Sequence, residues 1–468
     1  MEIQNGRGYQ LIKLLMSGFC IGLIMISGAC KKDNVKKEYP QGSNEHINTW
    51  ILDSLNRYYY WASELPKKPD LGQLPTSFFN SVRNTSDRFS QLYLPNQAGV
   101  SSSRSLYGFD YAVIQEPLSQ QVFGLIKCVL KGSPAERYGL KRGTYIRKVN
   151  GKTFSSSNVA ALDQELLTGR TTKLTLTELK EGVYTDQPEL NMIAGLTFDQ
   201  PAVHQVIEWG GAKIGYVYID GFSGGLSRTL IPVFSGFKND GVSDLIIDLR
   251  YNSGGDVSEA AGLCAMIAPG INYNTDFITY KGNKNGGQRK ESIGAAATFD
   301  KRVEFNSLLQ SNISMKRVFV LATGATASAS EVLINNLKPY MQVKVIGTKT
   351  MGKDEASFLI RDERIPRQVD WEMYPIVYKL FNAQGQGGYQ TGILPDLEVS
   401  EFSVLPLVPF GNVNDALLSK ALTQISSQGK IGQKLSSLAE PKYAPQNSVV
   451  LSDSHLTKAS RSIVLTHR

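Results

Sequence analysis

The second half of the chain contains the clearest alternation of apolar and polar segments. Residues 318–322 are an apolar, β-branched run, which is typical of a buried strand. Small residues follow at 324–330, and apolar residues then recur at helical spacing over 332–337 until a proline ends the pattern. A second apolar run covers residues 343–347. The pattern predicts a strand, a turn of small residues, a helix and a second strand in succession.

The first third of the chain shows two further patterns. Apolar residues from Ile47 follow helical spacing until Pro66, and another short helix is expected at 77–82. These segments predict a small helical domain at residues 46–104. From residue 105 the pattern changes to short strands separated by turns, which predicts a mainly β domain at 105–182.

Within this β domain, local signals place one helix and one hairpin. Ser133 can cap a helix whose first residue is Pro134, and Gly139 can end that helix. The Asn150-Gly151 pair predicts a tight hairpin turn.

The remaining segments belong to a larger core and a tail. Residues 214–219 and 245–250 predict two more strands in a core at residues 183–425, which ends with a helix over 414–425. The tail, residues 426–468, is rich in Ser, Lys and Gln and is expected to be loosely ordered.

Composition narrows the classes of function. Hydrophobic residues make up 41% and charged residues 20% of the 468 residues, which is ordinary for a globular protein of two or three domains. The net charge of +8 is spread without a basic stripe interleaved with aromatic residues, so nucleic-acid binding is not indicated. No Cys or His pair has the spacing of metal ligands, and no metal site is expected. Cys128 and Cys264 are expected to be buried free thiols.

Residues 1–30 have the three parts of a signal peptide. Arg7 and Lys13 precede an apolar stretch, which small residues and Cys30 follow. As a helix this stretch would reach about 20 Å, short of the roughly 30 Å core of a bilayer. The small residues before Cys30 resemble a bacterial lipoprotein cleavage box, although Ser27 stands where that box usually has Leu.

This resemblance implies that Cys30 is acylated and that residues 31–45 form a tether. The protein would then be exported and lipid-anchored to the bacterial cell envelope, with the membrane as a partner. Simple secretion, with Cys30 incidental, is the alternative.

Ser328 stands at the predicted start of the helix that follows the small-residue turn. Backbone N–H groups at a helix start can hold an oxyanion, and a desolvated lysine such as Lys353 can activate a serine as a nucleophile. The segment from Ser328 to Glu331 has an alternative interpretation as a capping box, in which Ser328 caps the helix and Glu331 reaches back. Taken alone, the segment favours capping.

In combination, these motifs resemble the carboxyl-terminal processing (tail-specific) protease family. The family's S-A-S-A-S-E motif appears here as T-A-S-A-S-E at residues 326–331, and its T-x-G-K motif appears at residues 350–353. The resemblance implies that Ser328 is the nucleophile and Lys353 its general base.

Residues 248–255 resemble a further motif of the family, D-L-R-x-N-x-G-G. Two glycines after a strand leave the backbone uncovered, so their N–H groups can face a substrate carbonyl. The resemblance implies that Gly254 or Gly255 supplies one donor of an oxyanion hole and the N–H of Ala329 the other.

Residues 132–151 resemble part of a PDZ domain, and Tyr107-Gly108-Phe109 stand where such domains carry their carboxylate-binding loop. In that mode a free C-terminal tail adds as a strand to the sheet edge. A closed or self-occupied groove is the alternative. Residues 87–90 resemble the D-x-x-S that precedes the PDZ domain in these proteases, and no chemistry is assigned to them.

The resemblance covers roughly residues 45–425 and implies an α/β multi-domain fold. Its core would be of the ββα-superhelix type shared with the Clp protease subunit and crotonases, accompanied by a PDZ domain and a small N-terminal helical domain.

Two positions depart from the family pattern. Pro339 stands where some members have an aspartate, and Ser357 stands where some have a glutamine that orients the lysine. Ser357 could still hydrogen-bond the lysine. Glu331 and Ser357 are candidates for supporting roles, and a third catalytic residue stays open.

Lys353 must be neutral to act as a base. A free lysine titrates near 10.4, whereas a base at neutral pH needs a pKa of roughly 7 to 8. A shift of about 3 units requires burial or a cationic neighbour. Asp354 and Glu355 would oppose the shift, so their side chains are expected to point away from Lys353.

The expected function is a cofactor-independent serine endopeptidase with a Ser/Lys dyad. Its substrates would be exported polypeptides recognised through their free C-terminal tails. One alternative is a catalytically inactive PDZ-type peptide-binding lipoprotein, and another is a binder of small hydrophobic ligands on the same core. The presence of both Ser328 and Lys353 argues against these alternatives. The sequence leaves the oligomeric state open.

Overall fold

The computed structural model describes residues 38–95, 102–116, 119–180, 183–196, 202–427 and 449–454. The predicted signal peptide with Cys30, part of the predicted tether and most of the tail lie outside these residues. No helix within the described residues is long and apolar enough to cross a membrane.

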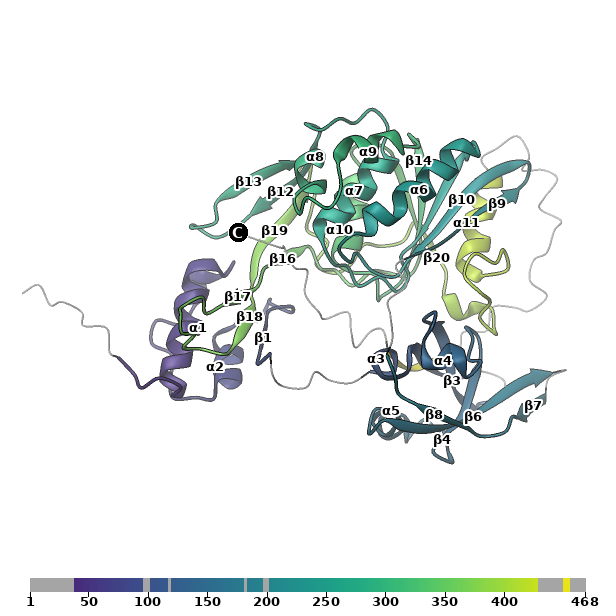
Figure 1. Cartoon of the computed structure of the whole chain (residues 1–468), viewed down its shortest axis with the longest axis horizontal. Helices are drawn as coiled ribbons and strands as arrows, with labels where there is room; N and C mark the ends of the chain where they lie inside the picture. Colours follow the sequence, from purple (N-terminus) through teal and green to yellow (C-terminus); the bar gives the residue numbers. More distant parts are fainter. Residues whose placement is uncertain are drawn as a thin grey trace, which may run out of the picture. The chain divides into compact units, whose positions relative to one another are not determined.

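A six-stranded sheet forms the centre of the core (Figure 1). Its strand order is β20-β15-β14-β11-β10-β9, and only β9 is antiparallel to its neighbour. The predicted strands at 214–219, 245–250, 318–322 and 343–347 are confirmed to within one or two residues at their ends. The bounds are β9 Ala202–Trp209, β10 Ala212–Ile219, β11 Asp244–Asp248, β14 Arg317–Ala322, β15 Gln342–Gly347 and β20 Leu397–Glu398.

Helices cover both faces of this sheet, which explains why its central strands are apolar throughout. One face packs against α6, α7, α8, α9 and α10, and the other packs against α11. The predicted helices after the small-residue turn and near residue 420 are confirmed as α10 and α11. The bounds are α6 Leu226–Asn239, α7 Val257–Ile267, α8 Ile293–Ala297, α9 Phe305–Gln310, α10 Ala329–Leu337 and α11 Ala416–Ser427.

A second core sheet has the strand order β13-β12-β19-β16. Its strand β16 begins two residues after Lys353, so this sheet carries the chain away from the predicted base. The bounds are β12 Asp276–Lys281, β13 Gln288–Ser292, β16 Glu355–Ser357 and β19 Ile376–Asn382.

The N-terminal part is helical, as predicted, but its first helix is shorter than expected. Helix α1, Asn44–Tyr58, ends well before Pro66 because the backbone turns extended at Tyr59 and the Tyr60 N–H donates to the Ile376 carbonyl. The rest of this part consists of a 3₁₀ turn at Ala62–Glu64, α2 Pro75–Val82, and the sheet of β1 Gln91–Tyr93, β18 Glu372–Tyr374 and β17 Ile360–Arg361. The last two strands come from the core segment.

Residues 102–196 together with 449–454 form a strand-rich part, which we call the module. Its sheet has the order β21-β2-β3-β4-β6-β7, with β5 on β4 and β8 on β6. The bounds are α3 Ser103–Tyr107, β2 Phe109–Gln115, β3 Val122–Val129, α4 Pro134–Arg137, β4 Tyr145–Val149, β5 Lys152–Thr153, α5 Val159–Leu166, β6 Thr171–Lys180, β7 Val183–Asp186, β8 Leu190–Ile193 and β21 Val449–Asp453.

The local predictions for the module are confirmed. Ser133 caps α4, and Asn150 and Gly151 adopt the positive φ values of 49° and 79° that a tight hairpin needs. The module extends beyond residue 182, because β8 pairs with β6. The expectation of a loosely ordered tail is wrong for β21, which pairs with β2. Cys128 and Cys264 are buried free thiols, as predicted.

Candidate active site

Ser328 lies in the turn between β14 and α10, in a strained backbone conformation. Its φ of +71° and ψ of −121° fall in a region that usually requires glycine, and such a conformation costs about 1–3 kcal/mol. Hydrogen bonds tie the turn to the loop after β11. Thr326 Oγ1 donates to the Leu249 carbonyl at 2.8 Å, and both the Ala327 N–H and Ser330 Oγ donate to the Asn252 carbonyl at 3.1 and 3.0 Å.

The Glu331 carboxylate connects the segments that carry the predicted nucleophile and base. Its Oε2 accepts hydrogen bonds from the backbone N–H groups of both Ser328 and Lys353, each at 2.8 Å. Its Oε1 accepts from Thr350 Oγ1 at 2.5 Å and from the Gly352 N–H at 2.8 Å. Burial raises the pKa of Glu331, and these four donors oppose that rise. The carboxylate therefore fixes the backbones of residues 328 and 353 relative to each other.

The capping interpretation of Ser328 holds only in part. Ser328 and Glu331 stand in capping-box positions, and Glu331 reaches back to the Ser328 N–H. Ser328 Oγ, in contrast, is fully buried and has no hydrogen-bond partner among the described residues. A buried hydroxyl without a partner costs free energy, so Ser328 Oγ does not serve as a structural cap and is available to a base.

Lys353 is buried with 0% exposure, and its environment favours the neutral amine. Burial lowers its pKa from 10.5 to about 8, although the charges of Glu355, Glu331 and Asp87 act in the opposite direction. The Phe89 ring lies 5.1 Å from Lys353 Nζ and shields it from solvent.

A second lysine neutralises the two acidic residues that follow Lys353. Lys379 Nζ donates to Asp354 Oδ1 at 3.1 Å and also binds Glu355 Oε1. The expectation that both carboxylates turn away from Lys353 agrees with the pairing of Asp354 Oδ1 with Lys379. It is met only partly by Glu355, which still raises that pKa.

Residues 87–90, to which the sequence assigned no chemistry, reach the surroundings of Lys353. Asp87 accepts hydrogen bonds from the Phe89 and Ser90 N–H groups at 3.0 and 2.9 Å, which orients this turn. Ser90 Oγ accepts from the Ile376 N–H at 2.8 Å and so anchors the turn to β19. The D-x-x-S motif was visible in the sequence, but its contact with Lys353 was not.

The glycine pair after β11 lies directly against Ser328. A Cβ on Gly254 would stand 2.4 Å from Ser328 Oγ, and one on Gly255 would stand 2.2 Å from the Phe222 carbonyl oxygen. Both glycines also have positive φ, at +105° and +137°. Side chains are therefore excluded at both positions, and no side chain from residue 254 or 255 blocks Ser328 Oγ.

The candidate oxyanion donors are not equivalent. The Gly254 N–H donates to Asn252 Oδ1 at 2.8 Å, so it is already committed. Phe222 pairs with this loop through two backbone hydrogen bonds: its N–H donates to the Gly254 carbonyl, and its carbonyl accepts from the Asp256 N–H. The Gly255 N–H takes part in neither bond and donates to no other described residue. The Ala329 N–H belongs to the first turn of α10, where N–H groups have no partner within the helix.

The remaining predicted site residues are located as follows. Ser357 is fully buried in β16. Tyr107 and Phe109 are fully buried in the module core, and the Gly108 N–H donates to the carbonyls of Ser103 and Arg104 at the end of α3. Tyr107 ends α3, Gly108 follows it, and Phe109 begins β2, which lies between β21 and β3. The two aromatic side chains and the Gly108 N–H are therefore used within the module.

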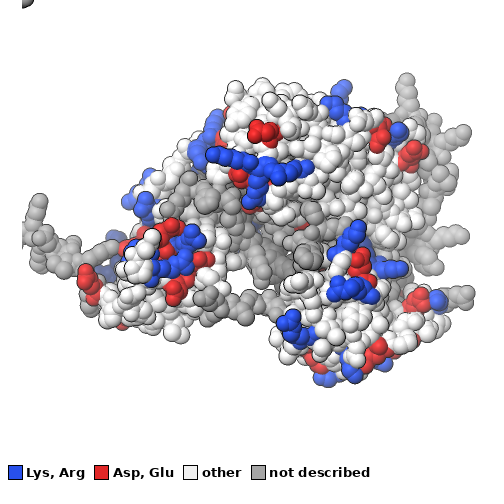
Figure 2. Space-filling model, viewed as in Figure 1, with Lys and Arg blue, Asp and Glu red and all other residues white. Residues whose placement is uncertain are grey.

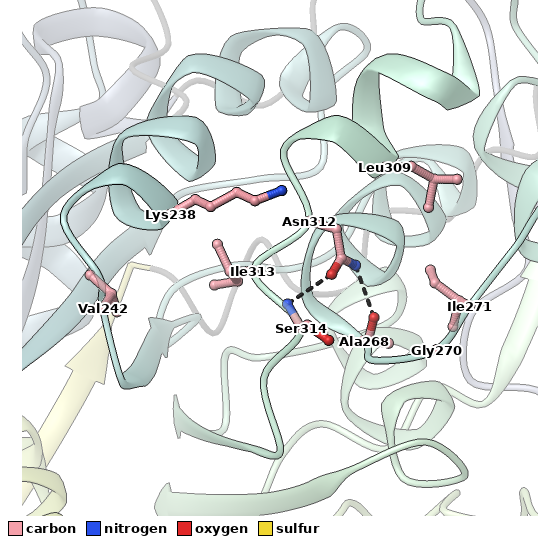
Figure 3. A pocket seen from close by; sticks show the side chains of 9 residues that line it. All are labelled: Lys238, Val242, Ala268, Gly270, Ile271, Leu309, Asn312, Ile313 and Ser314. Atoms are coloured by element: carbon pink, nitrogen blue, oxygen red, sulfur yellow. Dashed lines mark hydrogen bonds between the residues drawn. The ribbon is translucent and has the colours of Figure 1, made fainter.

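A cavity of about 510 Å³ lies elsewhere in the core (Figure 3). Lys238, Asn312 and residues from the ends of α6 and α7 line it, and none of the predicted catalytic residues does. The described residues contain no cluster of His, Cys, Asp or Glu that could hold a metal ion. On the face shown in Figure 2, basic and acidic side chains occur together.

Comparison with known proteins assigns the chain to a family. The model of "Peptidase family S41" matches residues 213–399, and the model of "Peptidase S41 N-terminal domain" matches residues 46–91. A "Carboxyl-terminal-processing protease" from Synechocystis sp. is 24% identical over 413 residues, covering 86% of this chain and 87% of that protein. A "Probable CtpA-like serine protease" from Staphylococcus aureus is 26% identical over 304 residues, and this chain spans 55% of its length.

A solved structure extends the comparison over nearly the whole fold. It is a putative S41 protease from Bacteroides fragilis, 30% identical, with a TM-score of 0.69 and coverage of 84% of this chain and 98% of that one. The core, with its mixed α/β content, therefore has the S41 peptidase fold. On this evidence the chain belongs to peptidase family S41 and is a serine-type peptidase.

Proposed function

We propose that this protein is an endopeptidase that uses Ser328 as its nucleophile and Lys353 as its general base. One observation carries the proposal: the N–H groups of both residues donate to the same oxygen, Glu331 Oε2, while Lys353 is buried with a lowered pKa. The shared carboxylate holds the two backbones close together, and a desolvated lysine can take the proton of a serine hydroxyl that has no other hydrogen-bond partner.

The reaction follows from this arrangement. Ser328 Oγ attacks the scissile carbonyl carbon while neutral Lys353 takes the hydroxyl proton, and the carbonyl oxygen becomes an oxyanion. The N–H groups of Ala329 and Gly255 bind this oxyanion. Lys353 then returns the proton to the leaving amine as the C–N bond breaks, which leaves an acyl ester on Ser328. Water attacks that ester while Lys353 accepts its proton. The bond between the acyl carbon and Ser328 Oγ then breaks, Lys353 returns the proton to Ser328 Oγ, and the new carboxyl end leaves.

Glu331 acts as a positioning residue in this scheme. Its oxygens contact backbone N–H groups and Thr350 Oγ1, so it orients both segments without touching substrate. A carboxylate suits this role because it is an acceptor only, and all four donors point toward it.

The substrates we propose are exported polypeptides with free C-terminal tails, read by the module as a PDZ domain. Support comes from the PDZ-like motif at 132–151, the strand β2 that follows Gly108, and the relative named a carboxyl-terminal-processing protease. We further propose export and attachment to the cell envelope through acylated Cys30. Its support is the lipoprotein-like box in the sequence.

Peptide cleavage tests both proposed catalytic residues. Two fluorogenic peptides that differ only in a free or an amidated C-terminus are given to wild-type protein, Ser328→Ala and Lys353→Ala. We expect each variant to lose at least about 10⁴-fold in kcat/KM while its thermal unfolding transition persists. Wild type should prefer the free carboxylate.

Ser103→Ala is the matched control, because Ser103 Oγ is also buried without a hydrogen-bond partner among the described residues. It should keep the wild-type kcat/KM. A different outcome would refute the dyad: wild type binds the free-ended peptide but cuts neither peptide, and Ser328→Ala changes only the unfolding temperature. Ser328 would then be a helix cap and the protein a peptide binder.

The lowered pKa of Lys353 predicts how activity and stability depend on pH. Only the neutral amine accepts a proton, so kcat/KM should rise as pH increases through about 8. Between about 8 and 10.5 the unfolded chain holds a proton that the folded protein has released, so the free energy of unfolding should also rise with pH there.

Stopped assays over a buffered pH series and denaturant titrations measure the two effects. Lys353→Arg keeps its charge over the whole range and should be inactive throughout. An activity midpoint near 10.5, or a profile without any midpoint, would contradict a desolvated Lys353 as the base.

Glu331→Gln tests the positioning role. The amide NH₂ would face backbone N–H groups in place of one acceptor oxygen, so we expect kcat to fall by about 100-fold through misplacement of the dyad. The variant also removes a negative charge that raises the Lys353 pKa, so the activity midpoint should move below about 8.

Glu259→Gln makes the same exchange in another buried carboxylate, which binds the N–H groups of Gly225 and Ser227. Its activity midpoint should stay at the wild-type value. If Glu331→Gln loses activity without any shift of the midpoint, Glu331 is merely structural.

A further inference from the structure

The edge of the module sheet beside β2 is occupied by a C-terminal segment of the same chain. Strand β21 runs antiparallel to β2, with Val449 opposite Gln115 and Asp453 opposite Ala112. Beyond it, the Ser454 N–H donates to the Tyr111 carbonyl, and Ser454 Oγ accepts from the Tyr111 N–H, both at 3.0 Å. The segment therefore runs toward Gly108, in the direction that a tail would take if its end docked at the loop before β2.

Side chains of the segment fit a groove between β2 and α5. Leu451 packs against the apolar core of the module. Ser452 Oγ donates to Asp163 Oδ2 on α5 at 2.6 Å, while Tyr111 of β2 donates to Asp163 Oδ1 at 2.5 Å. Asp163, on α5, thus binds the Tyr111 hydroxyl of β2 and the Ser452 hydroxyl of β21 at the same time.

Asp453 makes the third specific contact, with a buried lysine. Lys127 Nζ donates to Asp453 Oδ2 at 2.6 Å, and the Lys127 side chain is only 1% exposed. The same ammonium lies 3.6 Å from Glu401 Oε1 and 4.3 Å from the centre of the Tyr251 ring. Tyr251 immediately precedes the Asn252–Gly255 loop of the active site, so this end of the groove is adjacent to the catalytic core.

The first residues of the segment contribute little. The side chains of Val449 and Val450 are 56% and 40% exposed. Recognition is therefore concentrated in Leu451, Ser452 and Asp453. A five-residue strand at the sheet edge, recognised mainly through three side chains, can be displaced by another strand with the same chemistry.

We propose that Val449–Asp453 is an internal ligand of the module, and that the groove selects polypeptide tails with an apolar, a hydroxyl and an acidic residue in succession. This inference rests on the proposed tail-reading role of the module. A substrate tail must displace the internal strand, which competes at the high effective concentration of a tethered ligand. If the internal strand fills the groove about 90–99% of the time, an external tail binds about 10- to 100-fold more weakly than to an empty groove.

Binding to the full chain tests the proposal. The protein carries Ser328→Ala so that nothing is cleaved, and the probe is a fluorescein-labelled peptide Val-Val-Leu-Ser-Asp-Ser with a free carboxylate. Adding Leu451→Asp removes the apolar anchor of the internal strand, so the probe should bind at least about 10-fold more tightly. Adding Val449→Asp instead changes an exposed position of the same strand and should leave the Kd within about twofold.

A second probe tests the selectivity. In Val-Val-Leu-Ala-Asn-Ser the hydroxyl and the charge are removed, and its affinity for the Leu451→Asp protein should be at least about 10-fold lower than that of the first probe. Hydrogen exchange on the protein without substitutions in β21 provides an independent readout. Excess unlabelled Val-Val-Leu-Ser-Asp-Ser should speed the exchange of the Val449–Asp453 amides, because their strand leaves β2.

Three results would overturn the inference: equal probe affinity with and without Leu451→Asp, equal affinity for both probes, or exchange of the Val449–Asp453 amides that saturating peptide leaves unchanged. None of them bears on the dyad, because binding is measured without cleavage. Failure of the dyad would appear only in the cleavage assays with Ser328 and Lys353 variants, and the binding results would still decide this inference.

Discussion

The site depends on one buried carboxylate, that of Glu331. Its four hydrogen bonds join the start of α10 to the Thr350–Lys353 segment, so the positions of these two segments are fixed relative to each other. Hydrogen bonds to a charged group contribute about 1.5–3 kcal/mol each, which is comparable to the strain at Ser328. Because the carboxylate binds three backbone N–H groups and Thr350 Oγ1, and not Ser328 Oγ, that hydroxyl stays uncommitted for the proposed chemistry.

The second constraint is the burial of Lys353 among acidic groups. Desolvation lowers its pKa, whereas Glu355, Glu331 and Asp87 raise it, and the outcome of about 8 reflects both effects. Lys379 is essential to this balance, since it pairs with Asp354 and Glu355 and limits their effect. The N-terminal part contributes through Phe89, whose ring covers the amine. The proposed base is thus tuned by three segments far apart in the sequence.

Strong local patterns made much of the core predictable. The apolar runs at 318–322 and 343–347 gave buried strands, and the small residues between strand and helix placed Ser328 at the start of α10. The sequence could not show which of Gly254 and Gly255 has an N–H available for an oxyanion. That depends on Asn252 Oδ1, which accepts a hydrogen bond from the Gly254 N–H. It missed the role of residues 87–90, which depends on a long-range contact. It also missed β21, because Val449, Val450 and Leu451 are only a short apolar run in a polar tail and do not indicate which strand they will join.

The central claim is that Ser328 is a nucleophile activated by Lys353. The most direct measurement is covalent labelling with a serine-reactive fluorophosphonate, with the modified residue identified by peptide mass spectrometry. We expect a single adduct, on Ser328, that forms faster as pH rises through about 8 and is almost absent in Lys353→Ala. An adduct on another serine, or labelling of Ser328 at an equal rate in Lys353→Ala, would contradict it.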